Sequence, residues 1–172
     1  IITNQNGKKK IGWRKAICGQ LLSNNLIKNY KIVISSVLMK AEIMSNQNCF
    51  NETYHIIGDF DFFTSKSKNY NIHCINEPLT VINFHEKNES KKYNLYISEL
   101  LQWKKINENN YPEMQSISSL IEYLTYLDLL ENEEKVTLLK KIIKGRLNKN
   151  KLIILIKLIF PKKLLNFFVL RV

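Results

Sequence analysis

The sequence FNETYHIIGDFDFF, from Phe50 to Phe63, constrains the fold more than any other stretch of the chain. Asp59 within it is a residue type that favours a helix N-terminus, and Phe60 and Phe63 fall on one face of a helix that begins there. We therefore expect a helix over residues 59–68. Taken alone, Asp59 has a structural interpretation as the cap of this helix beside any functional one.

The segments on either side of this helix carry strand patterns. Upstream, residues 31–39 (KIVISSVLM) are rich in β-branched side chains and predict a buried strand, followed by a short helix at 41–44. Downstream, residues 70–75 and 79–84 predict two short strands, because Pro78 between them interrupts a ladder and favours a turn. This alternation indicates part of an α/β domain.

From Ser90 onward the sequence changes to helical periodicity. Ser90 is the candidate N-cap of a helix, and two further helices are expected at 113–130 and 133–144. The expected apolar face of the first helix follows i, i+4, i+7 spacing and consists of Tyr93, Ile97, Leu100, Leu101 and the stem of Lys104. We therefore divide the chain into an α/β part, residues 1–106, and a helical extension, residues 107–172.

The net charge of +11 is concentrated at the C-terminal end. Residues 135–172 contain eleven basic side chains and no acidic one, whereas the preceding 15 basic and 15 acidic residues cancel. Residues 152–160 and 164–170 are apolar runs on either side of Pro161, too short to span a bilayer but suited to a helix in a membrane interface. The alternative is that these runs pack on the rest of the protein and their lysines are solvated. The basic residues around them are Lys149, Lys151, Lys157, Lys162, Lys163 and Arg171.

Several protein classes are disfavoured by composition. The odd set of Cys18, Cys49 and Cys74, without a Cys-x-x-Cys pair, indicates neither a disulfide framework nor a zinc knuckle, and suits a reducing compartment. The sequence has no apolar run of about 18 residues and no signal-peptide pattern. It starts at Ile1 in a polar stretch, so we expect it to be cut from a longer protein.

Four short motifs follow one another around the central helix. They are a Phe-Asn-Glu turn at Phe50, Asn51 and Glu52; the acidic motif Gly58, Asp59, Phe60 and Asp61; a Glu-Pro-Leu turn at Glu77, Pro78 and Leu79; and a strand end with His85, Asn88 and Ser90. Over residues 31–92 this order resembles the closing part of the GT-A catalytic domain in family 2 glycosyltransferases, especially those that build bacterial surface polysaccharides.

The resemblance implies an α/β fold, the C-terminal half of a Rossmann-like GT-A domain with a helical C-terminal extension. It implies an inverting glycosyltransferase in which Asp59 is the catalytic base, with Gly58, Asp61 and Ser90 in substrate binding and His85 near the metal. The implied cofactor is a divalent metal, Mg or Mn. The implied partners are a nucleotide-sugar donor and a glycan or lipid-linked acceptor. The basic C-terminal helices add a membrane surface as an expected partner, so we expect the protein in the cytoplasm, peripheral to the plasma membrane.

The chain also departs from this family pattern. Gly58 stands where many relatives have Glu, Asn83 where many have Arg, and Ser65 and Lys66 lie where another Arg is common. No Asp-x-Asp donor motif precedes Lys31, so we expect transfer activity to belong to a longer parent protein.

Two other functions stay open from the sequence. One is a degenerate scaffold, and the other is a non-catalytic basic protein that binds a membrane surface or nucleic acid. The interleaving of basic with aliphatic side chains argues against nucleic acid, because single-stranded nucleic acid is bound by exposed aromatic side chains. His55 and His73 lie outside the motifs, and we interpret them as structural.

Overall fold

The computed structural model forms two compact units, Ile1–Ile117 and Ser118–Val172, which are described separately. The residues that it describes are 2–3, 9–10, 23–44, 50–73, 75, 77, 79–83, 89–132, 134–144 and 147–159.

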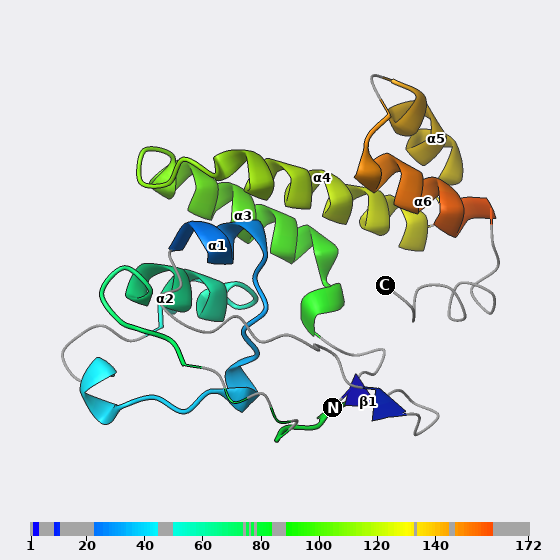
Figure 1. Cartoon of the computed structure of the whole chain (residues 1–172). Coiled ribbons are helices and arrows are strands. Elements are labelled where there is room, and N and C mark those ends of the chain that lie inside the picture. The colour runs from blue at the N-terminus through cyan, green and yellow to red at the C-terminus, as the bar shows by residue number, and fades with distance from the viewer. Residues whose placement is uncertain are drawn as a thin grey trace. The chain divides into compact units, whose positions relative to one another are not determined.

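Helices make up most of the described structure (Figure 1). The α-helices are α1 (Ser23–Lys28), α2 (Gly58–Lys66), α3 (Tyr93–Asn107), α4 (Met114–Glu131), α5 (Lys135–Ile143) and α6 (Lys149–Ile159). Short 3-10 helices are η1 (Ile34–Ser36), η2 (Ala41–Ile43) and η3 (Glu89–Lys91). Three strands of two residues each, β1 (Ile2–Thr3), β2 (Lys9–Lys10) and β3 (Ile82–Asn83), pair in the order β2-β1-β3.

The predicted α/β fold is wrong, because the described residues contain no sheet of the length that a Rossmann-like domain requires. Residues 31–39 do not form the expected buried strand. Instead η1 interrupts them, and the side chain of Leu38 is 99% exposed. The Ser36 hydroxyl donates to the carbonyl of Val33 at 2.7 Å, a local bond of the kind that competes with strand pairing.

The predicted pair of strands at 70–75 and 79–84 is also wrong in the part of it that the structure describes. The only residues of this region assigned to a strand there are Ile82 and Asn83, and they pair in parallel with Ile2 and Thr3 of β1. The side chains of Ile75, Leu79 and Val81 are exposed, so these segments do not present a buried apolar face there.

Three of the predicted helices are confirmed. The expected helix at 59–68 is α2, and those at 113–130 and 133–144 are α4 and α5. Ser90 does not cap α3, because it lies in η3 and the N-cap position belongs to Lys92. The expected apolar face of α3 was also misplaced, since its buried residues are Glu99, Leu100 and Trp103 while Leu101 is exposed.

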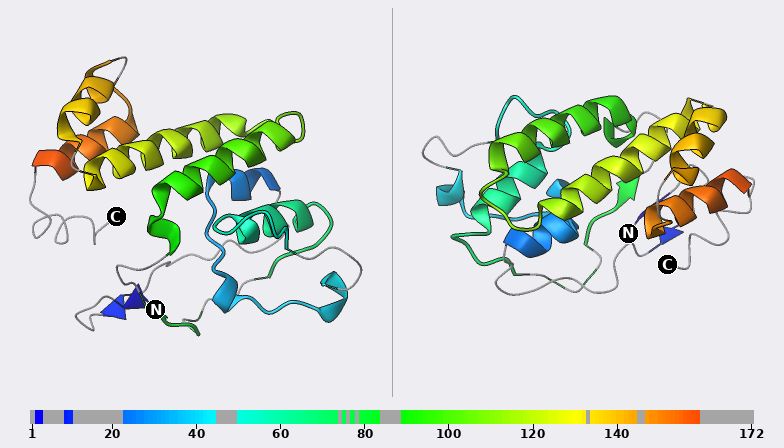
Figure 2. Two further views of the ribbon diagram at one scale, coloured as in Figure 1. Left: turned by 180° about the vertical axis from the view of Figure 1, so that it is seen from behind. Right: turned by 90° about the horizontal axis from the view of Figure 1, so that it is seen from above.

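The core of the first unit is built on α2, which packs beside α1 (Figures 1 and 2). Phe60 packs edge-on against Trp103 of α3, with ring centroids 4.9 Å apart. Phe62 and Phe63 are buried with Leu26 of α1 in a second cluster. Phe62 was not expected in the core, and its burial together with that of Phe60 and Phe63 places apolar side chains on two faces of α2.

The second unit has its own core. Its buried apolar residues come from the later part of α4, from α5 and from α6: Tyr126, Leu129, Leu138, Ile142 and Ile154. Lys151 of α6 is also buried, and its ammonium donates a hydrogen bond of 2.9 Å to the carbonyl of Lys144, the residue that ends α5. None of the helices in the described ranges is both long and apolar enough to cross a membrane.

Candidate functional site

The carboxylate of Asp59 lies in the first turn of α2. The helix begins one residue earlier, at Gly58, and its N-cap residue Ile57 provides no side-chain cap. Asp59 therefore does not act as the conventional cap that its local sequence suggested. Its Oδ1 accepts a hydrogen bond of 2.7 Å from the N–H of Phe60, and the side chain stays partly exposed.

Two tyrosines from different segments flank this carboxylate, Tyr30 after α1 and Tyr96 in α3. The Tyr30 hydroxyl approaches Asp59 as a donor and so lowers the pKa of Asp59, yet the two groups do not form a hydrogen bond of good geometry. Tyr30 Oη is buried and has no partner of good geometry among the residues described. The pKa of both tyrosines is raised, first by burial and then by the charge of Asp59.

Burial has the larger effect on Asp59 itself. It raises the pKa of this carboxyl above its ordinary value of 3.8, and the hydrogen bond from Phe60 and the nearby hydroxyl of Tyr30 offset only part of the rise. The position in the first turn of a helix favours the ionised carboxylate, because the helix dipole stabilises an anion there. Burial acts in the opposite direction, because it disfavours the charged form.

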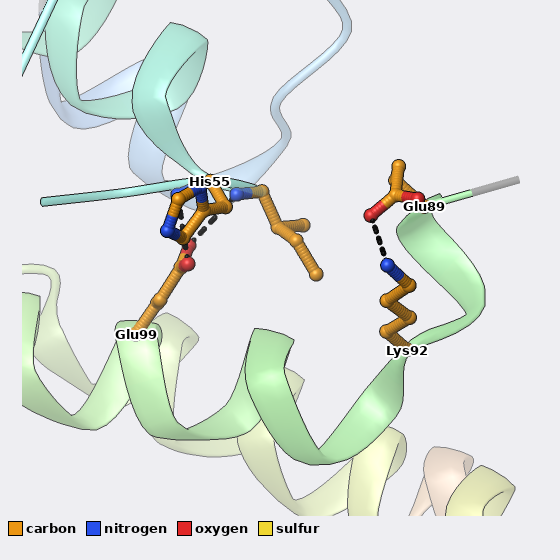
Figure 3. Close-up of polar contacts among 5 residues, drawn as sticks. His55, Glu89, Lys92 and Glu99 are labelled. Atoms are coloured by element: carbon orange, nitrogen blue, oxygen red, sulfur yellow. Dashed lines mark hydrogen bonds and ion pairs between the residues drawn. The ribbon is translucent and has the colours of Figure 1, made fainter. Parts of the chain in front are cut away.

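The approach to α2 is fixed by Glu99, a buried carboxylate of α3 with 4% of its surface exposed. Figure 3 shows Glu99 pointing from α3 toward the backbone at His55. Its Oε1 accepts from the N–H of His55 at 2.8 Å, and its Oε2 accepts from Ile56 and Ile57 at 2.9 and 3.0 Å. Glu99 thus satisfies the N–H of the N-cap residue Ile57 and holds the backbone that leads into Asp59.

Asp61 points to a different partner. Its Oδ1 accepts a hydrogen bond of 2.8 Å from the indole nitrogen of Trp103. Burial raises the pKa of Asp61, and this hydrogen bond partly lowers it again. Trp103 also stacks on Tyr111, so Asp61 is tied to the aromatic core of the first unit.

The other predicted site residues are placed as follows. Gly58 is the first residue of α2, and a Cβ built there would meet nothing within 4 Å, so the space beside it is open. Ser90 lies in η3, next to the Glu89–Lys92 ion pair of 2.7 Å that Figure 3 also shows, and its side chain is outside the description. His85 falls outside the described residues.

A metal site is not assigned. Among the residues described, no group of three or more His, Cys, Asp and Glu side chains is placed to hold a metal ion.

Sequence reasoning missed the residues that hold the site together: Tyr30, Tyr96, Glu99 and Trp103. For α3 a signal was present, because Tyr96, Glu99, Leu100 and Trp103 follow i, i+3, i+4, i+7 spacing and a Glu on such a face suggests a buried partner. For Tyr30 no local pattern points to Asp59. Comparisons of the chain with protein-family models, with curated proteins and with solved structures found no match.

Proposed function

We propose that the protein transfers a sugar from a nucleotide-sugar donor to a cell-envelope glycan or glycolipid, with Asp59 as the catalytic base. One observation carries the proposal: Asp59 is a partly exposed carboxylate with a pKa raised by burial, and it directly follows Gly58, where an added Cβ would meet nothing within 4 Å. A carboxylate with a raised pKa is a stronger proton acceptor while it remains ionised.

A sugar hydroxyl is a poor nucleophile at neutral pH, so its attack needs a positioned base. In the proposed step, the Asp59 carboxylate takes the hydroxyl proton while the hydroxyl oxygen bonds to the anomeric carbon of the donor. The bond from that carbon to the diphosphate breaks on the opposite side, and the nucleoside diphosphate leaves with the electron pair. The anomeric configuration inverts, and Asp59 then releases its proton to water.

The surrounding residues are proposed to position this base. Glu99 fixes the backbone before α2 through its three backbone hydrogen bonds. Burial raises the pKa of the Asp59 carboxyl, and the hydroxyl of Tyr30 lowers it in part. The order of motifs over residues 31–92 and the setting of Asp59 support the proposal.

We also propose where the reaction takes place. Nucleotide-sugars and lipid-linked acceptors meet at the cytoplasmic face of the plasma membrane, and we assign the protein to that face as a peripheral component.

The test is sugar transfer by the full-length gene product. The wild type and Asp59→Asn are incubated with radiolabelled UDP-glucose, UDP-N-acetylglucosamine or GDP-mannose and membranes of the source organism, and label in the acceptor is counted. We expect Asp59→Asn to fold normally and to lose transfer by about 100-fold or more. Asp128→Asn makes the same chemical change in the second unit and should retain activity. Near-normal transfer by Asp59→Asn would show that Asp59 is not the base.

A further inference from the structure

Helix α5 carries an apolar stripe that the second unit does not bury. The side chains of Val136, Leu139 and Ile143 are 67%, 42% and 79% exposed. Their i, i+3, i+7 spacing places them on one face of the helix. Leu138 and Ile142 on another face are buried in the core, so α5 has one apolar face inside the unit and one outside.

Helix α6 repeats this arrangement. Ile154 is fully buried in the core of the unit, whereas Leu152 and Ile156, four residues apart, are exposed. All exposed large apolar side chains in the described part of the second unit are aliphatic.

The charge on these two helices has one sign. Residues 135–159 contain eight basic side chains and no acidic one. Two of the eight are held inside the unit: Lys151 donates to the carbonyl of Lys144, and Lys157 donates to the Tyr123 hydroxyl at 3.0 Å. The exposed lysines in the described part of the segment are Lys135, Lys140, Lys141, Lys144 and Lys149.

We propose that the exposed face of α5 and α6 docks on an anionic phospholipid bilayer. An interfacial helix combines an aliphatic stripe, which enters the boundary of the acyl chains, with lysines that contact the lipid headgroups. The inference rests on the peripheral location proposed above but not on the transfer activity, because none of its residues belongs to the site at Asp59. It also narrows the set of basic residues expected to contact the membrane, because Lys151 and Lys157 form hydrogen bonds within the second unit.

Two other occupants fit less well. Nucleic acid would leave the aliphatic stripe exposed, because interfaces with nucleic acid are polar and single strands stack on aromatic side chains. A second copy of the chain would bring two sets of lysines together, and their repulsion opposes such a contact.

The test is sedimentation of the intact chain with phosphatidylcholine vesicles that do or do not contain phosphatidylglycerol. We expect binding only with phosphatidylglycerol. Lys140→Gln combined with Lys141→Gln should weaken it about 30-fold, and Val136→Ser combined with Ile143→Ser by about tenfold or more. The matched controls in the first unit, Lys91→Gln with Lys105→Gln and Leu101→Ser with Ile106→Ser, should bind as the wild type does.

These variants replace exposed side chains, and circular dichroism will confirm that they fold. Equal binding to both kinds of vesicle would overturn the proposal, as would unchanged binding of the α5 variants. A third result would overturn it: the wild type does not bind vesicles, and the α5 variants abolish its self-association or its binding of single-stranded RNA.

Discussion

Replacement of Glu99 by Gln is the perturbation whose effect follows most directly from the structure. The Glu99 carboxylate accepts three backbone N–H groups at 2.8, 2.9 and 3.0 Å while 4% exposed. Gln is almost the same size, but it has one acceptor oxygen, and its amide nitrogen is a donor. At least one backbone N–H therefore faces a donor in the variant and loses its partner.

The magnitude follows from the number and kind of these bonds. A hydrogen bond to a charged group contributes about 1.5–3 kcal/mol, and one between neutral groups contributes about 1 kcal/mol. Losing one charge-assisted bond and weakening two others destabilises the first unit by about 3 kcal/mol, because removing the buried charge recovers part of its desolvation penalty. A loss of this size increases local opening roughly 100-fold.

Hydrogen exchange measures this opening at the bonds concerned. In Glu99→Gln, we expect the amides of His55, Ile56 and Ile57 to exchange roughly 100-fold faster, and urea unfolding to shift by a matching free energy. Glu108→Gln, at an exposed position after α3, is the control and should stay within about 0.5 kcal/mol of the wild type. If Glu99→Gln exchanges as slowly as the control, the carboxylate does not hold the entry to α2.

Three further predictions concern stability. The pKa of Asp59 is raised in the folded state, so the wild type should lose stability as pH rises from below 3.8 through the folded-state pKa. Asp59→Asn should lack that loss, and urea unfolding at a series of pH values measures the difference. Parallel stability curves for the two proteins would contradict the prediction. Thr64 is fully buried, and its hydroxyl has no hydrogen-bond partner among the described residues. Thr64→Val should therefore stabilise the protein by about 1 kcal/mol in urea unfolding. Destabilisation would mean that the hydroxyl has a hydrogen-bond partner in the folded protein. Lys151→Met keeps the apolar stem but leaves the Lys144 carbonyl without the ammonium donor, so it should destabilise the second unit by about 1–2 kcal/mol in thermal unfolding. Lys149→Met, at an exposed position, is the control and should change stability little. Equal effects of the two substitutions would show that the bond from Lys151 does not stabilise the unit.

The parts of the fold that sequence predicted are those fixed by local interactions. Acidic residues at the start of α2 and apolar periodicity along α4 and α5 act within a few turns of the same helix, and these helices appeared near the expected positions. The strand predicted at 31–39 failed because β-branched residues favour a strand only where a partner covers them. In the described structure Leu38 is exposed and η1 interrupts the segment.

In the candidate site, too, local sequence features could be predicted and long-range contacts could not. Asp59 could be selected from the order of motifs, but the groups that set its pKa and position come from distant segments. Tyr30 lies after α1, and Glu99 reaches the backbone before α2 across 42 to 44 positions of the sequence. The spacing along α3 indicates that Glu99 is buried, but nothing local to these residues identifies their partners. The bond from Trp103 to Asp61 likewise spans 42 positions.

The most direct test of Asp59 as the base is chemical rescue of sugar transfer by Asp59→Ala in the full-length gene product. A small carboxylate such as formate can enter the space left by the side chain and accept the hydroxyl proton in its place. We predict that Asp59→Ala is inactive without formate and regains transfer in proportion to added formate, while the wild type is unaffected. Full transfer by Asp59→Ala in the absence of formate would contradict the assignment.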